Sequence, residues 1–387
     1  MVISTDNMRQ LAGQIDALVG DTPAKDIANP FHLQLENNFR LWLAQEGVSI
    51  ALTTYEGAKL ILIGPGMRGG TIVAERNFER CMAVAVESDR HIWVSTHHNI
   101  WKLENGLQPN RQLDGWDRVY MPRTAHVTGG VDIHDLVSTG HGPLLGVVTL
   151  YNCVAHIGEG YHGSFSPFWR PPFISEIIGE DRCHLNGFCM DKGQPAYASI
   201  VGVSNERDGW RAHRNDGGVI VDMRTDKIVV TGLSMPHTPR LHKGKLYFLE
   251  AGRGWFCSVD PDSGKIVRLI WRPGFLRGLR FYKNYAFLCC SKPRDETFKG
   301  LPLDKELEDR GQEARCSLDI VNMDNMSVVH SIEITGSVKE IYDVAILPGC
   351  RQPLLYGVEG ADIKKIVVLG EDETSLGPLS ERGKKGA

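Results

Sequence analysis

A hairpin that occurs three times sets the architecture of this chain. Each copy reads as an apolar strand, a tight polar turn and a second apolar strand, at residues 219–230, 257–268 and 319–330. An Asp or Asn stands at the same place in each copy: Asp222, Asp260 and Asn322. Neighbouring copies are 38 and 62 residues apart, and a polar insertion at 291–315 accounts for the longer interval. Short strands with a period of about 40 residues are typical of β-propeller blades.

The rest of the chain has the same character. From residue 59 to 370, short apolar runs alternate with turns rich in glycine, proline, asparagine and aspartate. This pattern indicates many short strands. A helical pattern occurs at residues 6–18, where Met8, Leu11, Ile15 and Leu18 share one face.

Spacing locates the starts of the inner strands. Counting 15 residues from Asp222 leads to His237, and 17 from Asp260 leads to Arg277, each directly before an apolar strand. Three earlier positions share a spacing of 15 residues to a Ser or Thr further along the chain. They are Arg80 with Ser95, His134 with Thr149, and His184 with Ser199. Glu340 or Asp343 supplies the sixth position.

Six inner strands predict an all-β, six-bladed β-propeller with a short N-terminal helical segment. We expect a helical extension at 1–30, the propeller at 31–372, with residues 31–79 helping to close the ring, and a polar tail at 373–387.

The six inner-strand starts should meet at one mouth of the central channel. Polar side chains that converge on an axis need a compensating ligand, water or ion. His134, His184 and His237 are therefore predicted to bind a divalent metal ion, with Zn, Fe, Cu and Ca left undistinguished. Arg80 or Arg277 would hold a carboxylate in a two-pronged contact, and Glu340 or Asp343 would act as a base.

Further polar residues should surround this ring. Asp135 and Asn186 stand beside channel histidines and would orient them or cap turns. Asn152 and the pair His97 and His98 follow second strands, which return to the same face. Arg182 would touch the substrate or support a neighbouring blade.

These residues predict a metal-dependent enzyme acting on a small polar, carboxylate-bearing molecule, with redox-neutral lyase, isomerase or hydrolase chemistry favoured. One alternative is an iron- or copper-dependent oxidoreductase on the same three histidines. Another is a binding or scaffold propeller without catalysis. A thiol nucleophile at Cys183 or Cys189 has little support, because neighbours on a strand point to opposite sides and Cys183 adjoins His184.

The net charge and the cysteines indicate the kind of partner and the cellular compartment. The net charge of -4 gives no basic field for nucleic acid or a membrane surface, so the expected partner is a small-molecule substrate, with a protein partner left open. The nine cysteines show no paired CxxC spacing and read as buried free thiols. Such thiols suit a reducing compartment, and with no signal peptide or membrane-spanning stretch we expect a cytoplasmic protein.

Several longer motifs carry a family resemblance. They are DIHD (132–135), WRPPFIS (169–175), EDRCHLNG (180–187), LSMPHTPR (233–240), GFLRGL (274–279) and EIYDV (340–344). Over about residues 39–350 the chain resembles a family of conserved hypothetical bacterial proteins, which implies no particular reaction. The resemblance implies signature roles for the motif residues His134, Asp135, Arg182, His184, Asn186, His237, Arg240, Arg277, Glu340 and Asp343.

Two segments depart from the family pattern, at 94–101 and 157–165, and both should flank the mouth. In architecture the chain is also similar to six-bladed propellers of the gluconolactonase and strictosidine-synthase type, which hold a metal on the axis.

Overall fold

The computed structural model describes residues 31–368, apart from 37, 67–68, 141–142, 159–162, 294–297, 360–362 and 365. The expected extension at 1–30, with its helix at 6–18, and the tail at 373–387 lie outside these residues.

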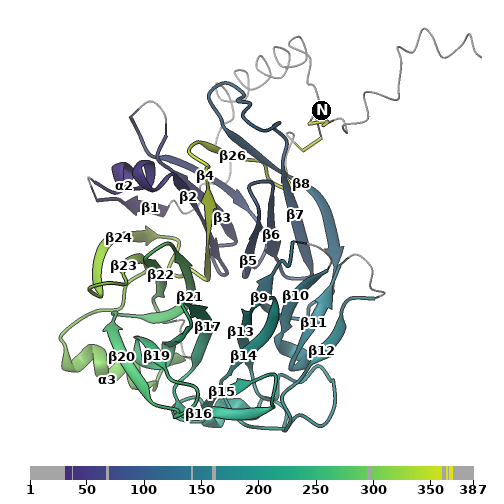
Figure 1. Cartoon of the computed structure of the whole chain (residues 1–387), viewed down its shortest axis with the longest axis vertical. Coiled ribbons are helices and arrows are strands. Elements are labelled where there is room, and N and C mark those ends of the chain that lie inside the picture. Colours follow the sequence, from purple (N-terminus) through teal and green to yellow (C-terminus); the bar gives the residue numbers. More distant parts are fainter. Residues whose placement is uncertain are drawn as a thin grey trace, which may run out of the picture.

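Six sheets, each with four antiparallel strands at its core, surround a central channel, so the predicted fold class is confirmed (Figure 1). From the channel outward, blade 1 is β5 (Val84–Glu87), β6 (His91–Ser95), β7 (Asn99–Asn105) and β8 (Arg118–Val127). Blade 2 is β9 (Ile133–Val137), β10 (Leu144–Val148), β11 (Cys153–Ile157) and β12 (Ser166–Trp169). Blade 3 is β13 (Leu185–Asp191), β14 (Gln194–Ile200), β15 (Gly218–Asp222) and β16 (Lys227–Leu233).

The remaining blades bring the chain back to its start. Blade 4 is β17 (Pro236–His242), β18 (Lys245–Glu250), β19 (Trp255–Val259) and β20 (Ile266–Trp271). Blade 5 is β21 (Phe275–Tyr282), β22 (Tyr285–Ser291), β23 (Ser317–Asn322) and β24 (Ser327–Gly336). Blade 6 combines the late strand β25 (Asp343–Pro348) with β2 (Val48–Thr54), β3 (Lys59–Gly64) and β4 (Ile72–Asn77).

The ring is closed by strands from both ends of the propeller. In blade 6 the register of β25 with β2 runs from Val48 opposite Pro348 to Thr53 opposite Asp343. Two edge strands extend other blades: β1 (Phe31–Gln34) pairs with β24, and β26 (Pro353–Leu355) pairs in parallel with β8. The N-terminal part of the propeller therefore closes the ring, as predicted.

Helices are few among the described residues. They are the α-helices α2 (Phe39–Glu46) and α3 (Pro302–Asp309) and the 3₁₀ turns η1 (Thr149–Tyr151), η2 (Gly209–His213) and η3 (Ala251–Arg253). Helix α2 buries Phe39, Trp42 and Leu43 against blades 5 and 6 and ends at Gly47, whose φ of 69° is left-handed. In the described part of the chain no helix is long and apolar enough to cross a membrane.

The repeated hairpins are the turns between the third and fourth strands of blades 3, 4 and 5. Asp222 accepts a hydrogen bond from the backbone N–H two residues later, at 2.9 Å. Asp260 and Asn322 do the same, at 3.1 Å and 2.9 Å. An Asx turn needs Asp or Asn at this place, which explains the register seen in the sequence.

A buried hydroxyl at the end of the second strand links neighbouring blades. Ser95 Oγ donates to Ile133 O (3.2 Å) and Thr149 Oγ1 to Leu185 O (2.8 Å), each at the inner strand of the next blade. Ser291 and Thr53 make the equivalent bonds to Ile341 O and Met82 O. Such bonds fix each inner strand relative to its neighbour, so they position whatever side chains stand at the strand starts.

All nine cysteines are buried and none forms a disulfide, as expected. Cys183 lies in the core between blades 2 and 3 with Val147, Val154 and Phe188. Burial raises the pKa of the Cys183 thiol well above its usual value, so the thiol is protonated near neutral pH. This is the opposite of what a thiol nucleophile needs.

Candidate functional site

The starts of the inner strands meet at one end of the channel, around a cavity of about 10 Å³. This space holds about one water molecule. Its lining residues come from blades 2 to 6 or the turns before them: His134, Asp135, Asn186, His237, Thr238, Arg240, Arg277, Tyr342 and Asp343. We call this end of the channel the histidine mouth.

His134 is the second residue of β9. Its Nδ1 lies 3.2 Å from the backbone oxygen of Asp132, a residue with the left-handed φ of 63°. Because a carbonyl oxygen can only accept, Nδ1 carries the proton and Nε2 carries the lone pair. No described residue donates a hydrogen bond to that Nε2.

His184 directly precedes β13 and has the left-handed φ of 50°. Its Nδ1 donates to the Asp181 carboxylate at 2.8 Å, and the indole N–H of Trp210 donates to the same oxygen at 2.8 Å. The Trp210 ring covers the imidazole at a centroid distance of 4.3 Å. The Nε2 of His184 has no hydrogen-bond partner in the described chain, and the ring meets that of His134 edge to face at 5.0 Å.

His237 is held at both nitrogens. Its Nδ1 donates to Met235 O at 2.9 Å, and its Nε2 accepts from the Asn186 side-chain amide at 3.0 Å. Asn186 therefore orients His237 and occupies the lone pair that a metal ion would need.

Burial keeps two of the imidazoles neutral. Burial, which disfavours the charged ring, lowers the pKa of His134 to about 4. Burial and the nearby Arg277 lower the pKa of His237 well below its usual value. Burial alone would raise the pKa of Asp181, but His184, His134 and the Trp210 N–H outweigh it and lower the pKa. The mouth therefore combines the neutral imidazoles of His134 and His237 with the ionised carboxylate of Asp181.

The low pKa of His134 makes stability depend on pH. In the unfolded chain this histidine takes up its proton near pH 6.5, whereas in the folded chain it resists until about pH 4. We expect the free energy of unfolding to fall between pH 6.5 and 4, with roughly 3 kcal/mol of that fall due to His134. Urea unfolding of wild type and His134→Gln across this range measures the contribution. His98→Gln, at an exposed histidine, is the control, and its free energy of unfolding should change with pH as that of wild type does. An equal fall in the free energy of unfolding of wild type and His134→Gln would contradict the assignment.

Arg277 brings a positive charge to the mouth. It is the third residue of β21, is 5% exposed and lines the cavity. Its guanidinium lies over the rings of Phe275 (4.9 Å), Tyr342 (5.2 Å) and Phe298 (5.5 Å). These cation–π contacts hold the guanidinium in place at the mouth.

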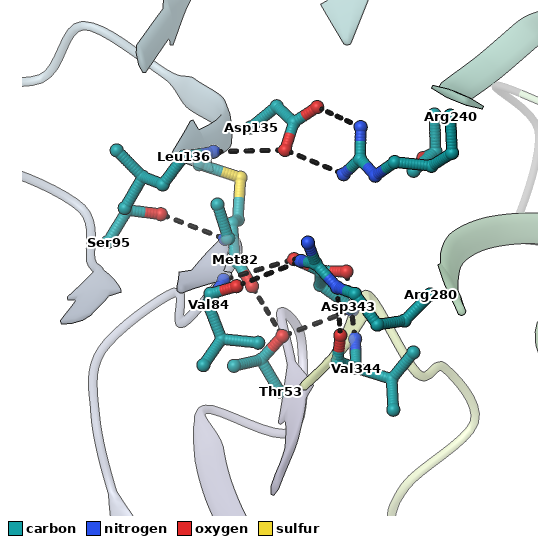
Figure 2. A network of polar contacts seen from close by, with 12 residues as sticks. Thr53, Met82, Val84, Ser95, Asp135, Leu136, Arg240, Arg280, Asp343 and Val344 are labelled. Atoms are coloured by element: carbon teal, nitrogen blue, oxygen red, sulfur yellow. Dashed lines mark hydrogen bonds and ion pairs between the residues drawn. The ribbon is translucent and has the colours of Figure 1, made fainter. Parts of the chain in front are cut away.

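Two ion pairs close the channel below the mouth (Figure 2). Arg240 of β17 makes two bonds of 2.9 Å to Asp135 of β9, reaching past blade 3, where it also donates to Phe188 O at 2.7 Å. Asp343 accepts from the backbone N–H groups of Val84 and Val344 and lies 3.7 Å from Arg280. Burial raises the pKa of Asp343, against the effect of Arg280. The mouth is therefore a closed cup and not the entrance of an open pore.

Several predicted site residues lie away from the cavity. Arg80 is exposed on the rim, 3.4 Å from His97 Nδ1 and over the ring of Tyr55, while His98 is exposed beside His97. Asn152 is fully buried and accepts from the Cys183 backbone N–H at 3.0 Å.

Arg182 and Glu340 are also buried outside the cavity lining. Arg182 pairs with Glu180 at 2.8 Å and with Glu176 at 3.0 Å, so it supports the loop before β13.

The fit of a metal ion can be judged from the three histidines. All three Nδ1 atoms are anchored, which is how proteins prepare Nε2 for a metal. Only His134 and His184 keep that atom available. In the described part of the chain no group of three or more His, Cys, Asp or Glu side chains is arranged to hold a metal ion. The residues thus fit two imidazole ligands, and the three-histidine site stays a prediction.

The residues of the mouth absent from the predicted set include Asp181, Trp210, Thr238, Phe298 and Tyr342. The sequence contains one indication of a role for Asp181, because this residue stands three positions before His184. Trp210 lies between the second and third strands of blade 3, and Phe298 lies between those of blade 5, in loops that no repeat marks. Phe298 belongs to the polar insertion, which packs Leu301 and Leu303 of the α3 region against Trp210 and Phe275.

Two solved structures show what the chain is similar to. A protein of unknown function from Bacteroides caccae is 10% identical with a TM-score of 0.47, and the match covers 77% of this chain and 98% of that one. A chain of a nidogen/laminin complex is 10% identical with a TM-score of 0.49, covering 78% of this chain and 99% of that one. Both scores are below 0.5, so the fold assignment rests on the strand topology of the chain itself.

No curated protein matches the chain. Residues 37–356 match the family model described as Domain of unknown function (DUF4915), a span that includes the predicted 39–350. The chain therefore belongs to the DUF4915 family.

Proposed function

We propose that the protein is an enzyme that acts on a small carboxylate-bearing molecule at the histidine mouth, as a redox-neutral lyase or isomerase. The observation that carries this is the pairing of His184 with Asp181. The His184 ring lies against that of His134, which lines the same cavity as Arg277. A base and an anion-binding group in one closed cup are the minimum for removing a proton from a carbon next to a carboxylate.

Arg277 would hold the substrate carboxylate. A guanidinium presents its donors as a planar fork that matches two carboxylate oxygens. The rings of Phe275, Tyr342 and Phe298 fix the plane of that fork. Displacement of the single water that the cavity can hold would make room for one carboxylate oxygen.

His184 would act as the general base through Nε2. Its Nδ1–H···Asp181 hydrogen bond fixes the tautomer and stabilises the imidazolium that forms when Nε2 takes the proton. His134, with a pKa near 4, stays neutral and accepts a hydrogen bond from the substrate. These two Nε2 atoms would hold the reacting part of the molecule.

Binding of simple carboxylates tests the anion site. A panel of 2-hydroxy, 2-oxo and 2-amino acids is screened by ligand-observed NMR against wild type and Arg277→Lys. We expect at least one acid to bind wild type and to lose about tenfold in affinity in Arg277→Lys, because lysine keeps the charge but loses the fork. Arg80→Lys changes an arginine on the rim and is the control. Its affinity for the same acid should stay within threefold of the wild-type affinity. Equal affinity in wild type and Arg277→Lys would remove Arg277 from the site.

A divalent metal ion is the second candidate, favoured by the anchored Nδ1 atoms and facing rings of His134 and His184. When bound, such an ion would polarise the substrate carboxylate or a bound water. Elemental analysis of protein purified without chelators tests this. Stoichiometric metal that is lost in both His134→Ala and His184→Ala would establish it, and wild-type metal content in those variants would refute it.

A further inference from the structure

The opposite end of the channel has a cavity of its own, of about 410 Å³. It lies between blades 5, 6 and 1, where β21, β25 and β5 end, whereas the histidine mouth lies where they begin. We call it the far cavity. It is lined by Val86, Ser88, Asp89, Arg280, Phe281, Tyr282, Ala345, Ile346 and Pro348. This volume is in the range of sites for small organic ligands.

A guanidinium stands in the wall of the far cavity. Arg280 donates from Nε to Val344 O (3.1 Å) and from one terminal nitrogen, Nη2, to Val84 O (3.2 Å). Its distance of 3.7 Å to Asp343 is longer than a hydrogen bond. Its other terminal nitrogen, Nη1, has no hydrogen-bond partner in the described chain, and the side chain is 25% exposed. Arg280 can therefore donate to an anion in the cavity while keeping its existing bonds.

The other walls are mainly apolar or aromatic. Val86, Ala345, Ile346 and Pro348 are aliphatic, and Phe281 is held in place by stacking on His242 at 4.4 Å. The acidic residue of the lining, Asp89, pairs with Arg118 at 3.1 Å, so its charge is balanced at the rim. Arg280 is paired with Asp343, and its Nη1 is the donor left for a ligand.

We propose that the far cavity is a second binding site, for an aromatic or aliphatic molecule that carries one carboxylate. The carboxylate would contact Arg280, and the apolar body would lie against Val86, Ile346 and Phe281. The ion pair of Arg280 with Asp343 separates this site from the histidine mouth, so the two sites bind different molecules.

Benzoate, with benzamide as its uncharged match, tests the proposal. Dissociation constants are measured by NMR for wild type and for Val86→Glu and Val86→Gln, which differ in charge at nearly equal size. We expect benzoate to bind wild type at least tenfold more tightly than benzamide. Val86→Glu should weaken benzoate binding about tenfold by placing a second anion beside it, whereas Val86→Gln should stay within threefold of wild type.

Benzoate binding to Arg277→Lys shows which of the two sites the benzoate occupies. If benzoate lies in the far cavity, this change at the histidine mouth leaves its affinity unchanged. The proposal is overturned if benzoate does not bind, if Val86→Glu binds it as wild type does, or if Arg277→Lys and not Val86→Glu abolishes binding.

Discussion

Arg240→Ala should lower the free energy of unfolding by about 3–5 kcal/mol, the usual result of removing one partner of a buried ion pair. Asp135 is 3% exposed, and among the described residues it would keep as partners the backbone N–H groups of Leu136 and Phe188. A buried carboxylate without its counterion is costly because the protein interior solvates it poorly. Urea unfolding followed by tryptophan fluorescence measures the loss.

Two further variants make this result specific. Arg224→Ala also removes an arginine from an ion pair, but Arg224 pairs with Asp222 at the surface and its side chain is 39% exposed. This change should lower the free energy of unfolding by about 1 kcal/mol or less. The double change Asp135→Leu with Arg240→Met should recover much of the stability, because no charge is left buried. Equal losses in Arg240→Ala and Arg224→Ala would show that the channel pair does not hold the blades together.

The second large effect concerns Asp181. Asp181→Asn should lower kcat by about 10²–10⁴ with little change in KM, since an amide cannot stabilise the imidazolium of His184 as a carboxylate does. The base-limited arm of the pH profile should also shift to lower pH, which a purely structural role would not cause. The activity is assayed with the acid identified in the binding screen.

Asp132→Asn is the matched control for Asp181→Asn. Asp132 stands beside His134 as Asp181 stands beside His184, but its carboxylate is 3.9 Å from Nδ1 and its backbone oxygen makes the hydrogen bond. The control should therefore keep kcat within about tenfold of wild type. Equal losses in the two variants would place the base elsewhere in the mouth.

The sequence carried enough information to predict the ring and most of its polar lining. The Asx turns at Asp222, Asp260 and Asn322 are local, so their spacing marks the blades and leads to the inner-strand starts. That frame brought His134, His237, Arg277 and Asp343 together in the structure, with His184 against His134.

Pairings between residues of different blades could not be predicted in the same way. Asp135 and Arg240 are 105 residues apart, and their contact exists only because the ring closes. Asn186 and His237 are likewise 51 residues apart, so the occupied lone pair of His237 left no mark in the sequence. The aromatic residues Trp210 and Phe298 lie in loops between the second and third strands of a blade, and these loops vary in length and follow no period.

Hydrogen exchange at carbon tests the central proposal most directly. Each acid that binds is incubated in D₂O with a catalytic amount of protein, and ¹H NMR follows the loss of the proton on the carbon next to the carboxylate. We predict that wild type exchanges or converts at least one of these acids, that His184→Gln and Asp181→Asn lose this activity, and that Asp132→Asn keeps it. Acids that bind in an Arg277-dependent way, with neither exchange nor product in wild-type protein, would contradict the enzymatic proposal and identify a binding propeller.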